Sequence, residues 1–257
     1  MYIGTKALSP KDTFEFRLTV GGVEQVLYER KTDNKIFVVA RPGDVYQLHI
    51  RNRTDRRMEI ITAVDGRNTL KDEDGDARNS VGLTAGAFEV VTISGWRLND
   101  EQTGEFVFGT PLHSIAAKLA EPRLANVGVI GVAVYCEQPR ASHYDPTSLR
   151  NHAEYVMPPF SQLDSFGLSP EGPLKSGPHM MGGSVGTGIG AKQYDPIKRS
   201  TYRLPVNRGL GAKPETLIIG YDTEEVLERM GLLIPAEPDP FPGVPQNDTG
   251  YGAYQRS

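Results

Sequence analysis

T-F-E-F-R-L-T-V, at residues 13–20, alternates between apolar and polar side chains without interruption. Its phenylalanine, leucine and valine residues fall at the even positions from 14 to 20, and charged or hydroxyl-bearing residues fall between them. Alternation with this period is typical of a β-strand that is buried on one face. Gly21-Gly22 follows at once and suits a tight reversal, because glycine accepts the positive φ that hairpin turns require. We therefore expect an antiparallel sheet.

The same alternation continues outward from this stretch through the first half of the chain. Further strands are predicted at residues 26–28, 36–40, 46–50, 58–64, 87–96 and 105–108. The stretch at residues 126–137 is apolar on both faces, so we place it centrally in a sheet or against a partner. Gly128 and Gly131 within it indicate that another segment passes close by. The predicted fold class is mainly β, as an antiparallel β-sandwich or jelly-roll-like domain.

Proline placement divides the chain into two unlike halves. Four of the 19 prolines precede residue 138, and the remainder follow it. A stretch so rich in proline and glycine buries too little apolar surface to offset its ordering entropy alone. The predicted organisation is a β-sandwich domain at 1–137, an extended Pro/Gly-rich arm at 138–198, a small strand–helix unit at 199–234 and an extended tail at 235–257.

The strand–helix unit has its own local signals. Ser200–Leu204 and Glu215–Gly220 are predicted to pair as a small β-hairpin. A helix follows, with Asp222 as its predicted N-cap and Glu225 completing a capping box. Gly231 is the predicted C′ residue that ends the helix.

Composition excludes several classes of protein. The hydrophobic share is 38% and the formal net charge is −4, which argues against a partner held through nucleic-acid phosphates. Cys136 is the single cysteine, so no disulfide forms within the chain. The first residues show no secretory signal, and the longest apolar run is about half a membrane span. We therefore expect a soluble protein made in the cytoplasm.

The predicted partner-binding residues are apolar side chains of the arm and a run of arginines. A solvated linker does not carry so many apolar residues, whereas an arm that lies on another protein does. Arg51 precedes the arginine run, which either contacts an acidic partner or forms an ordinary charged hairpin tip. These predicted residues are Tyr144, Tyr155, Met157, Phe160, Phe166, Met180, Met181, Arg53, Arg56 and Arg57.

Two motifs resemble catalytic or nucleotide-binding loops but lack the necessary context. Residues 182–186 match the G-x-S-x-G nucleophile elbow around Ser184, yet the last histidine, His179, precedes the serine. Residues 186–192 resemble a phosphate-binding loop, but Gln193 stands where a P-loop has serine or threonine. We interpret both as parts of a Gly-rich loop and predict no catalytic residue.

Metal, cofactor and sugar sites have only weak signals. Asp72, Asp74 and Asp76 resemble part of a calcium loop, but Ala77 replaces the glycine that an EF-hand requires. The five histidines lack close ligand spacing, and with one cysteine no zinc set is apparent. Trp96 suits a buried core better than a carbohydrate platform. We predict no cofactor.

Three stretches together resemble a poorly characterised family of bacterial and bacteriophage-associated proteins. They are V-D-G-R at residues 64–67, N-V-G-V-I-G-V-A-V-Y at residues 126–135, and the region from G-T-G at residues 186–188 to I-I-G-Y-D at residues 218–222. The resemblance spans much of the chain from about residue 36 to 234. It implies a sandwich closed by the G-V-I-G-V-A-V-Y strand, and it carries over no catalytic residue.

The expected function follows from the arm and this resemblance. We predict a non-enzymatic virion structural protein, a capsid cement or decoration protein that binds major capsid protein or copies of itself and is oligomeric in the assembly. The expected location is the virion, with the cytoplasm as the alternative. Two other functions stay open: a ligand- or carbohydrate-binding module that uses residues 65–84, and a hydrolase with a dispersed site.

Overall fold

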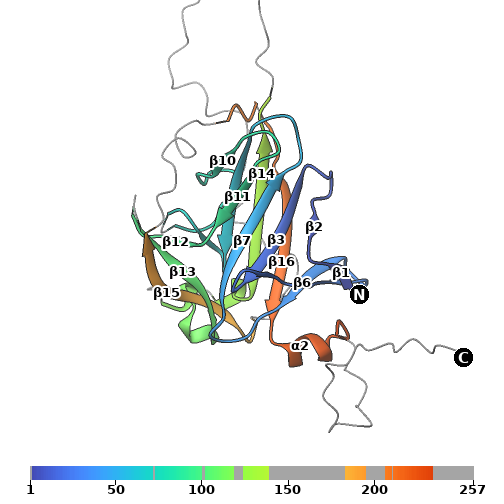
Figure 1. The fold of residues 1–257 in the computed structure, drawn as a ribbon, viewed down its shortest axis with the longest axis vertical. Coiled ribbons are helices and arrows are strands. Elements are labelled where there is room, and N and C mark those ends of the chain that lie inside the picture. The colour runs from blue at the N-terminus through green and yellow to red at the C-terminus, as the bar shows by residue number, and fades with distance from the viewer. Residues whose placement is uncertain are drawn as a thin grey trace, which may run out of the picture.

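The computed structural model describes residues 2–71, 73–99, 102–118, 124–138, 183–194, 206–209 and 211–233. Figure 1 shows that the described residues form long strands, with the α-helix at one end. None of the helices in these ranges combines the length and apolar character needed to span a bilayer. Several predicted residues and segments lie outside the described ranges: Tyr144, Tyr155, Met157, Phe160, Phe166, Met180, Met181, Asp72, Ser200–Leu204 and residues 235–257.

The first sheet, sheet A, has the strand order β1-β5-β6-β16-β14-β8-β10, with β9 paired to β8. All of its pairings are antiparallel except that of β16 with β6, which is parallel. The strands are β1 (Tyr2–Gly4), β5 (Leu27–Arg30), β6 (Lys35–Val39), β8 (Met58–Val64), β9 (Arg67–Asn68), β10 (Leu83–Ala85), β14 (Val129–Cys136) and β16 (Glu215–Asp222).

The second sheet, sheet B, has the order β12-β13-β7-β3-β2, and all of its pairings are antiparallel. Three further strands attach to it, because β11 pairs with β7, β15 with β13 and β4 with β3. The strands are β2 (Ala7–Leu8), β3 (Phe14–Val20), β4 (Val23–Glu24), β7 (Val45–Asn52), β11 (Val90–Ile93), β12 (Gly95–Arg97), β13 (Gln102–Gly109) and β15 (Gly186–Tyr194). The mainly β class predicted from the sequence is confirmed.

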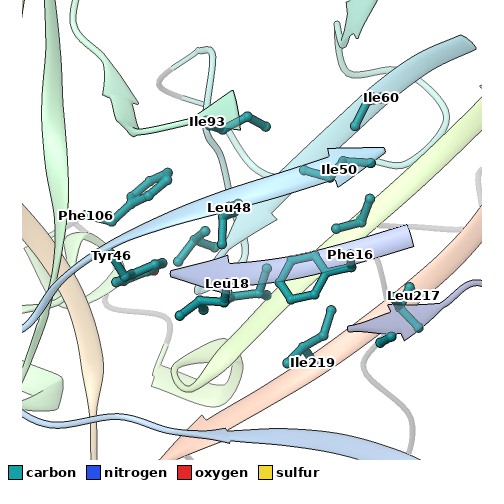
Figure 2. Packing of buried hydrophobic residues seen from close by; sticks show 14 of the residues in the cluster. Phe16, Leu18, Tyr46, Leu48, Ile50, Ile60, Ile93, Phe106, Leu217 and Ile219 are labelled. Atoms are coloured by element: carbon teal, nitrogen blue, oxygen red, sulfur yellow. The ribbon is translucent and has the colours of Figure 1, made fainter. Parts of the chain in front are cut away.

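Both sheets contribute to one hydrophobic cluster, and the apolar residues of the stretch at 13–20 face it as predicted. The opposite face of β3 is not simply solvated, because Glu15 and Thr19 are also buried. Phe16 and Leu18 of β3 are completely buried, and they share the cluster with Ile60 of β8 and Ile219 of β16. Figure 2 shows these side chains directed toward one another from strands of the two sheets. A fully buried side chain of this size stabilises the fold by about 1.5–3 kcal/mol.

The C-terminal strands are built into the two sheets. β15 pairs with β13 along Gln102–Gly109, and β16 lies between β14 and β6. Glu215–Gly220 pairs with β14 and, at its end, with β6, so it belongs to sheet A and not to a separate unit. The other strand of the predicted hairpin, Ser200–Leu204, lies outside the described residues, so the hairpin itself stays a prediction. The alternate residues Leu217 and Ile219 of β16 are buried in the shared core, which explains why this strand fills an interior position.

The placement of β14 confirms the prediction made from its two apolar faces. It lies between β16 and β8, in the middle of sheet A. Gly128 precedes it with a φ of +90°, and a Cβ added there would lie 3.2 Å from the Cα of Gly183. A segment therefore passes closely over Gly128, as its glycine indicated.

The described helices are short and lie next to strands in the sequence. Three 3-10 helices, η1 (Pro111–His113), η2 (Ile115–Lys118) and η3 (Leu124–Asn126), precede β14, and α2 (Glu224–Arg229) follows β16. The N-cap of α2 is Thr223, whose hydroxyl accepts from the Val226 N–H, so the prediction of Asp222 was wrong by one residue. Asp222 is still paired in β16, which delays the helix start. Gly231, at φ +71°, ends the helix as predicted.

Candidate functional site

The carboxylate of Asp65 is buried and accepts hydrogen bonds from residues of both sheets. Asp65 and Gly66 form a two-residue turn between β8 and β9, with φ of +50° and +79°. Turns of this type need positive φ at both residues, which aspartate and glycine tolerate best. The turn aims the carboxylate inward, and Asp65 is only 1% exposed.

Four hydrogen bonds satisfy this buried carboxylate. Oδ2 accepts from the Ser114 hydroxyl and from the Thr187 backbone N–H, both at 2.7 Å. Oδ1 accepts from the Gly128 N–H at 3.0 Å and from the Tyr221 hydroxyl. The donors come from the η1–η2 junction, the start of β15, the residue before β14, and β16. One side chain thus joins four segments that are far apart in the sequence.

A chain of hydroxyl groups leads away from this carboxylate. Tyr221 donates to Asp65, so its oxygen is free to accept from Thr187 Oγ1, 2.7 Å away. Thr187 in turn accepts from the Tyr46 hydroxyl, 2.9 Å away. The Tyr46 ring stacks on Phe108 with the ring centroids 4.1 Å apart. Because a carboxylate can only accept, the direction of every bond in this chain is fixed.

Burial sets the protonation of these groups. Loss of solvent raises the pKa of Asp65, and the hydrogen bonds from Tyr221, Thr187, Ser114 and Gly128 oppose that rise. Burial also raises the pKa of the Tyr46 and Tyr221 hydroxyls, so both remain neutral donors. The acceptor positions of the carboxylate are occupied by the fold itself. This centre therefore acts as a structural joint between strands.

A second polar joint lies on sheet A and holds the segment at residues 206–209. The Arg208 guanidinium donates to both oxygens of Glu59, at 2.8 and 2.7 Å, and to the Ser80 carbonyl at 3.2 Å. It also lies over the Tyr135 ring, 4.4 Å from the centroid. The Glu59 side chain is 9% exposed and that of Arg208 is 26% exposed. The pair therefore fixes a C-terminal segment to β8 and β14.

The motif around Ser184 does not have the geometry of a nucleophile elbow. The Ser184 hydroxyl donates to the Asp222 carboxylate, and the residue lies two positions before β15. A nucleophile elbow instead joins a strand to a helix. Gly186–Lys192 is part of β15 and is paired with β13, so it is no phosphate-binding loop either. The interpretation of this region as a Gly-rich loop is corrected, because most of it is a strand.

The other weak candidates are occupied by contacts within the fold. Asp74 forms an ion pair with Arg67, with the atoms 2.9 Å apart, and Asp76 accepts backbone N–H groups of its own turn. No group of three or more potential metal ligands occurs within the described ranges. Trp96 is only 5% exposed and donates its indole N–H to the Gly188 carbonyl, as expected of a core residue.

The predicted arginines have different surroundings. Arg53 forms ion pairs with Asp12 and Glu15, and Arg57 pairs with Glu137. Arg51 and Arg56 are exposed, and within the ranges that the structure covers neither forms an ion pair. They are therefore the two cations of this run that are available to a partner.

A histidine on the outer face of sheet B gives a pH prediction. His49 Nε2 lies 2.9 Å from Thr19 Oγ1, and Nδ1 lies 3.0 Å from Thr92 Oγ1. Burial lowers the pKa of His49, Arg17 lowers it further, and Glu24 opposes the shift. The unfolded chain therefore takes up this proton at higher pH than the folded chain, and the free energy of unfolding decreases as pH falls below about 6.5.

We expect His49→Gln to reduce that decrease. Urea unfolding of both proteins at pH 7.5 and pH 5.5 measures it, and the change between the two pH values should be smaller for the variant. An equal change in both proteins would show that His49 is not the group responsible.

Sequence reasoning missed both polar joints, although one signal was visible. Asp65-Gly66 directly follows an apolar strand, which is a hairpin signal. The partners of Asp65 come from distant segments, and no local pattern links them. Comparison with known proteins shows no matching family model, no similar curated protein and no similar solved structure.

Proposed function

We propose that this protein is a non-enzymatic structural component of a protein assembly, and most concretely a cement or decoration protein that binds capsid subunits of a phage. In this proposal the two sheets stack as a sandwich around their shared cluster and form a rigid body. The observation that carries the proposal is that the segment at residues 139–182, which contains the predicted apolar contacts, begins and ends next to fixed points on this body.

The two fixed points lie at opposite ends of β14. The Gln138 N–H donates to the Asn207 carbonyl at 2.9 Å, just after β14. The Gly183 N–H donates to the Val127 carbonyl at 3.1 Å, just before β14. Eight strand residues separate them, which corresponds to about 26 Å.

Tethering at both ends favours a role in binding proteins. A segment whose ends are already held loses less conformational freedom on docking than a free tail does. The predicted contacts, from Tyr144 to Met181, all belong to this tethered segment. Aromatic residues and methionine are enriched at protein interfaces, which supports a partner that is itself a protein.

The test compares two variants of the tethered segment in co-sedimentation with shells of the coat protein from the same genome. In the anchor variant, every predicted apolar contact is changed to serine: Tyr144, Tyr155, Met157, Phe160, Phe166, Met180 and Met181. In the control variant, Arg150, Asn151 and Glu154 are changed to serine. We expect the anchor variant to bind at least about tenfold more weakly and the control to bind like the wild type. A wild-type protein that stays in the supernatant would refute the proposal.

A further inference from the structure

We infer that the end of sheet B around Phe88 is a docking surface for an acidic protein segment that also carries an apolar side chain. This inference rests on the proposed function and specifies a second contact, on the described body of the protein. The surface comprises Leu8, Arg51, Arg56, Phe88 and Val90, and we call it the Phe88 face.

Hydrogen bonds hold the two turns of this face together. The Asn52 side-chain amide donates to the carbonyls of Arg56 and Gly86, both at 2.6 Å. The Phe88 N–H donates to the Thr54 carbonyl at 3.1 Å. The turns at residues 53–57 and 86–89 are therefore fixed relative to each other, and the face is preorganised.

Phe88 has a conformation that packing within the protein does not explain. Its φ is +58°, in the left-handed region that bulky residues rarely adopt, and 58% of it is exposed. Glycine or asparagine is the ordinary residue for such a turn position. A strained backbone conformation persists only when the surrounding structure holds it, and residues of this kind cluster at binding and active sites. Phe88 therefore fits a role in contacting a partner.

The register of sheet B places charge between apolar groups. Leu8 lies opposite Glu15, Glu15 opposite Arg51, and Arg51 opposite Val90. This row spans about 14 Å across four strands. Glu15 is buried beneath its ion pairs, whereas Leu8 and Val90 are exposed at the two ends of the row.

The available charges favour carboxylates on the partner. Arg51 and Arg56 are unpaired over the ranges that the structure covers, while the Glu89 carboxylate accepts from the Gly86 N–H. Asp55 and Glu89 are also exposed in these two turns and carry one negative charge each. The carboxylate directly opposite Arg51, that of Glu15, already pairs with Lys6, Arg17 and Arg53, so Arg51 adds a cation where the positive charges already outnumber their carboxylate. Arginine beside aromatic and aliphatic side chains is typical of the residues that dominate protein interfaces. A bare polyanion would leave Phe88 and Val90 without a contact.

The experiment measures binding of a fluorescein-labelled short peptide of alternating Glu and Leu, by anisotropy at low salt. We expect Phe88→Gly to weaken binding at least about fivefold while raising Tm by about 2–4 °C, because glycine accepts the positive φ. Arg51→Gln/Arg56→Gln should weaken binding by a similar factor and reduce its salt dependence. Leu112→Ala and Lys31→Gln/Lys213→Gln remove an exposed apolar group and two exposed cations elsewhere, and they should bind like the wild type.

Several outcomes would overturn the inference. They are equal binding of the Glu/Leu peptide and a Gln/Leu peptide, unchanged binding by Phe88→Gly, or heparin binding that competes fully and is insensitive to Phe88→Gly. The anchor variant of the tethered segment should still bind the peptide. If the anchor variant binds the peptide and fails only in shell co-sedimentation, both the proposed function and the Phe88 face are supported. If Phe88→Gly binds the peptide normally while the anchor variant loses binding to the shells, only the Phe88 face is refuted.

Discussion

Asp65→Asn is expected to lower the free energy of unfolding by about 3–5 kcal/mol, the largest effect of any single substitution considered. Asparagine preserves size and shape, yet each carboxylate oxygen accepts a backbone N–H, from Gly128 at Oδ1 and from Thr187 at Oδ2. Whichever way the amide turns, its NH2 group faces a buried N–H. In the variant, the amide NH2 and a backbone N–H are therefore buried facing each other without an acceptor, and one of the hydrogen bonds between segments is lost.

The matched control is Asp76→Asn. Asp76 also accepts backbone N–H groups, from Arg78 and Asn79, but through Oδ1 alone. Its Oδ2 faces the Asn79 side chain, which can turn to accept from an amide. We expect a loss below about 1 kcal/mol there. Denaturant unfolding measures both variants, and similar small losses would show that the buried joint contributes little.

Arg208→Ala should have the second largest effect, a loss of about 2–3 kcal/mol. The substitution leaves Glu59 almost buried without its cation and removes the contact with the Tyr135 ring. Part of the loss is offset because Arg208 itself is partly exposed, so water already screens the pair. A double-mutant cycle with Glu59→Ala should give a coupling energy above about 1 kcal/mol.

Arg30→Ala is the control for Arg208→Ala, because it removes a similar ion pair whose carboxylate is more exposed. Arg30 also donates twice to a carboxylate, that of Asp33, and lies over the Phe37 ring. The Arg30 side chain is 27% exposed, much like Arg208, but the Asp33 carboxylate is 32% exposed, so the expected loss is below about 1 kcal/mol. If Arg30→Ala and Arg208→Ala cost the same, the joint at Glu59 has no special role.

The sequence predicted the positions of individual strands better than it predicted which strands pair with each other. Residues 58–64 were predicted with the bounds that β8 has, because alternation and turn residues are local signals. The partner of β16 was missed, since a period-two pattern shows which side chains are buried but not which strand lies alongside. The parallel pairing of Ile219 with Ile36 joins two segments that are far apart in the sequence, so no local pattern indicates it.

The functional features were predictable to different degrees. The arginine run is visible in the sequence, but only the structure separates Arg51 and Arg56 from Arg53, which internal carboxylates neutralise. The strained backbone of Phe88 could not be predicted, because its neighbours Ala87 and Glu89 fit an ordinary strand. The sequence suggested residues 65–84 only as a stretch for ligand binding, whereas the partners of Asp65 come from segments up to 156 residues later in the chain.

The interior position of β16 has a consequence for biosynthesis. Among the described strands, β1, β5 and β6 make up one part of sheet A, β14, β8 and β10 make up the other, and β16 alone connects the two parts. On the ribosome, the strands of both parts are synthesised well before Glu215–Asp222. Until then β6 and β14 lack the strand that lies between them, and each has an unpaired edge. Sheet A can close only after β16 has been synthesised, and pairing across such a large sequence separation is slow. During that interval the chain is most exposed to aggregation and most in need of chaperones.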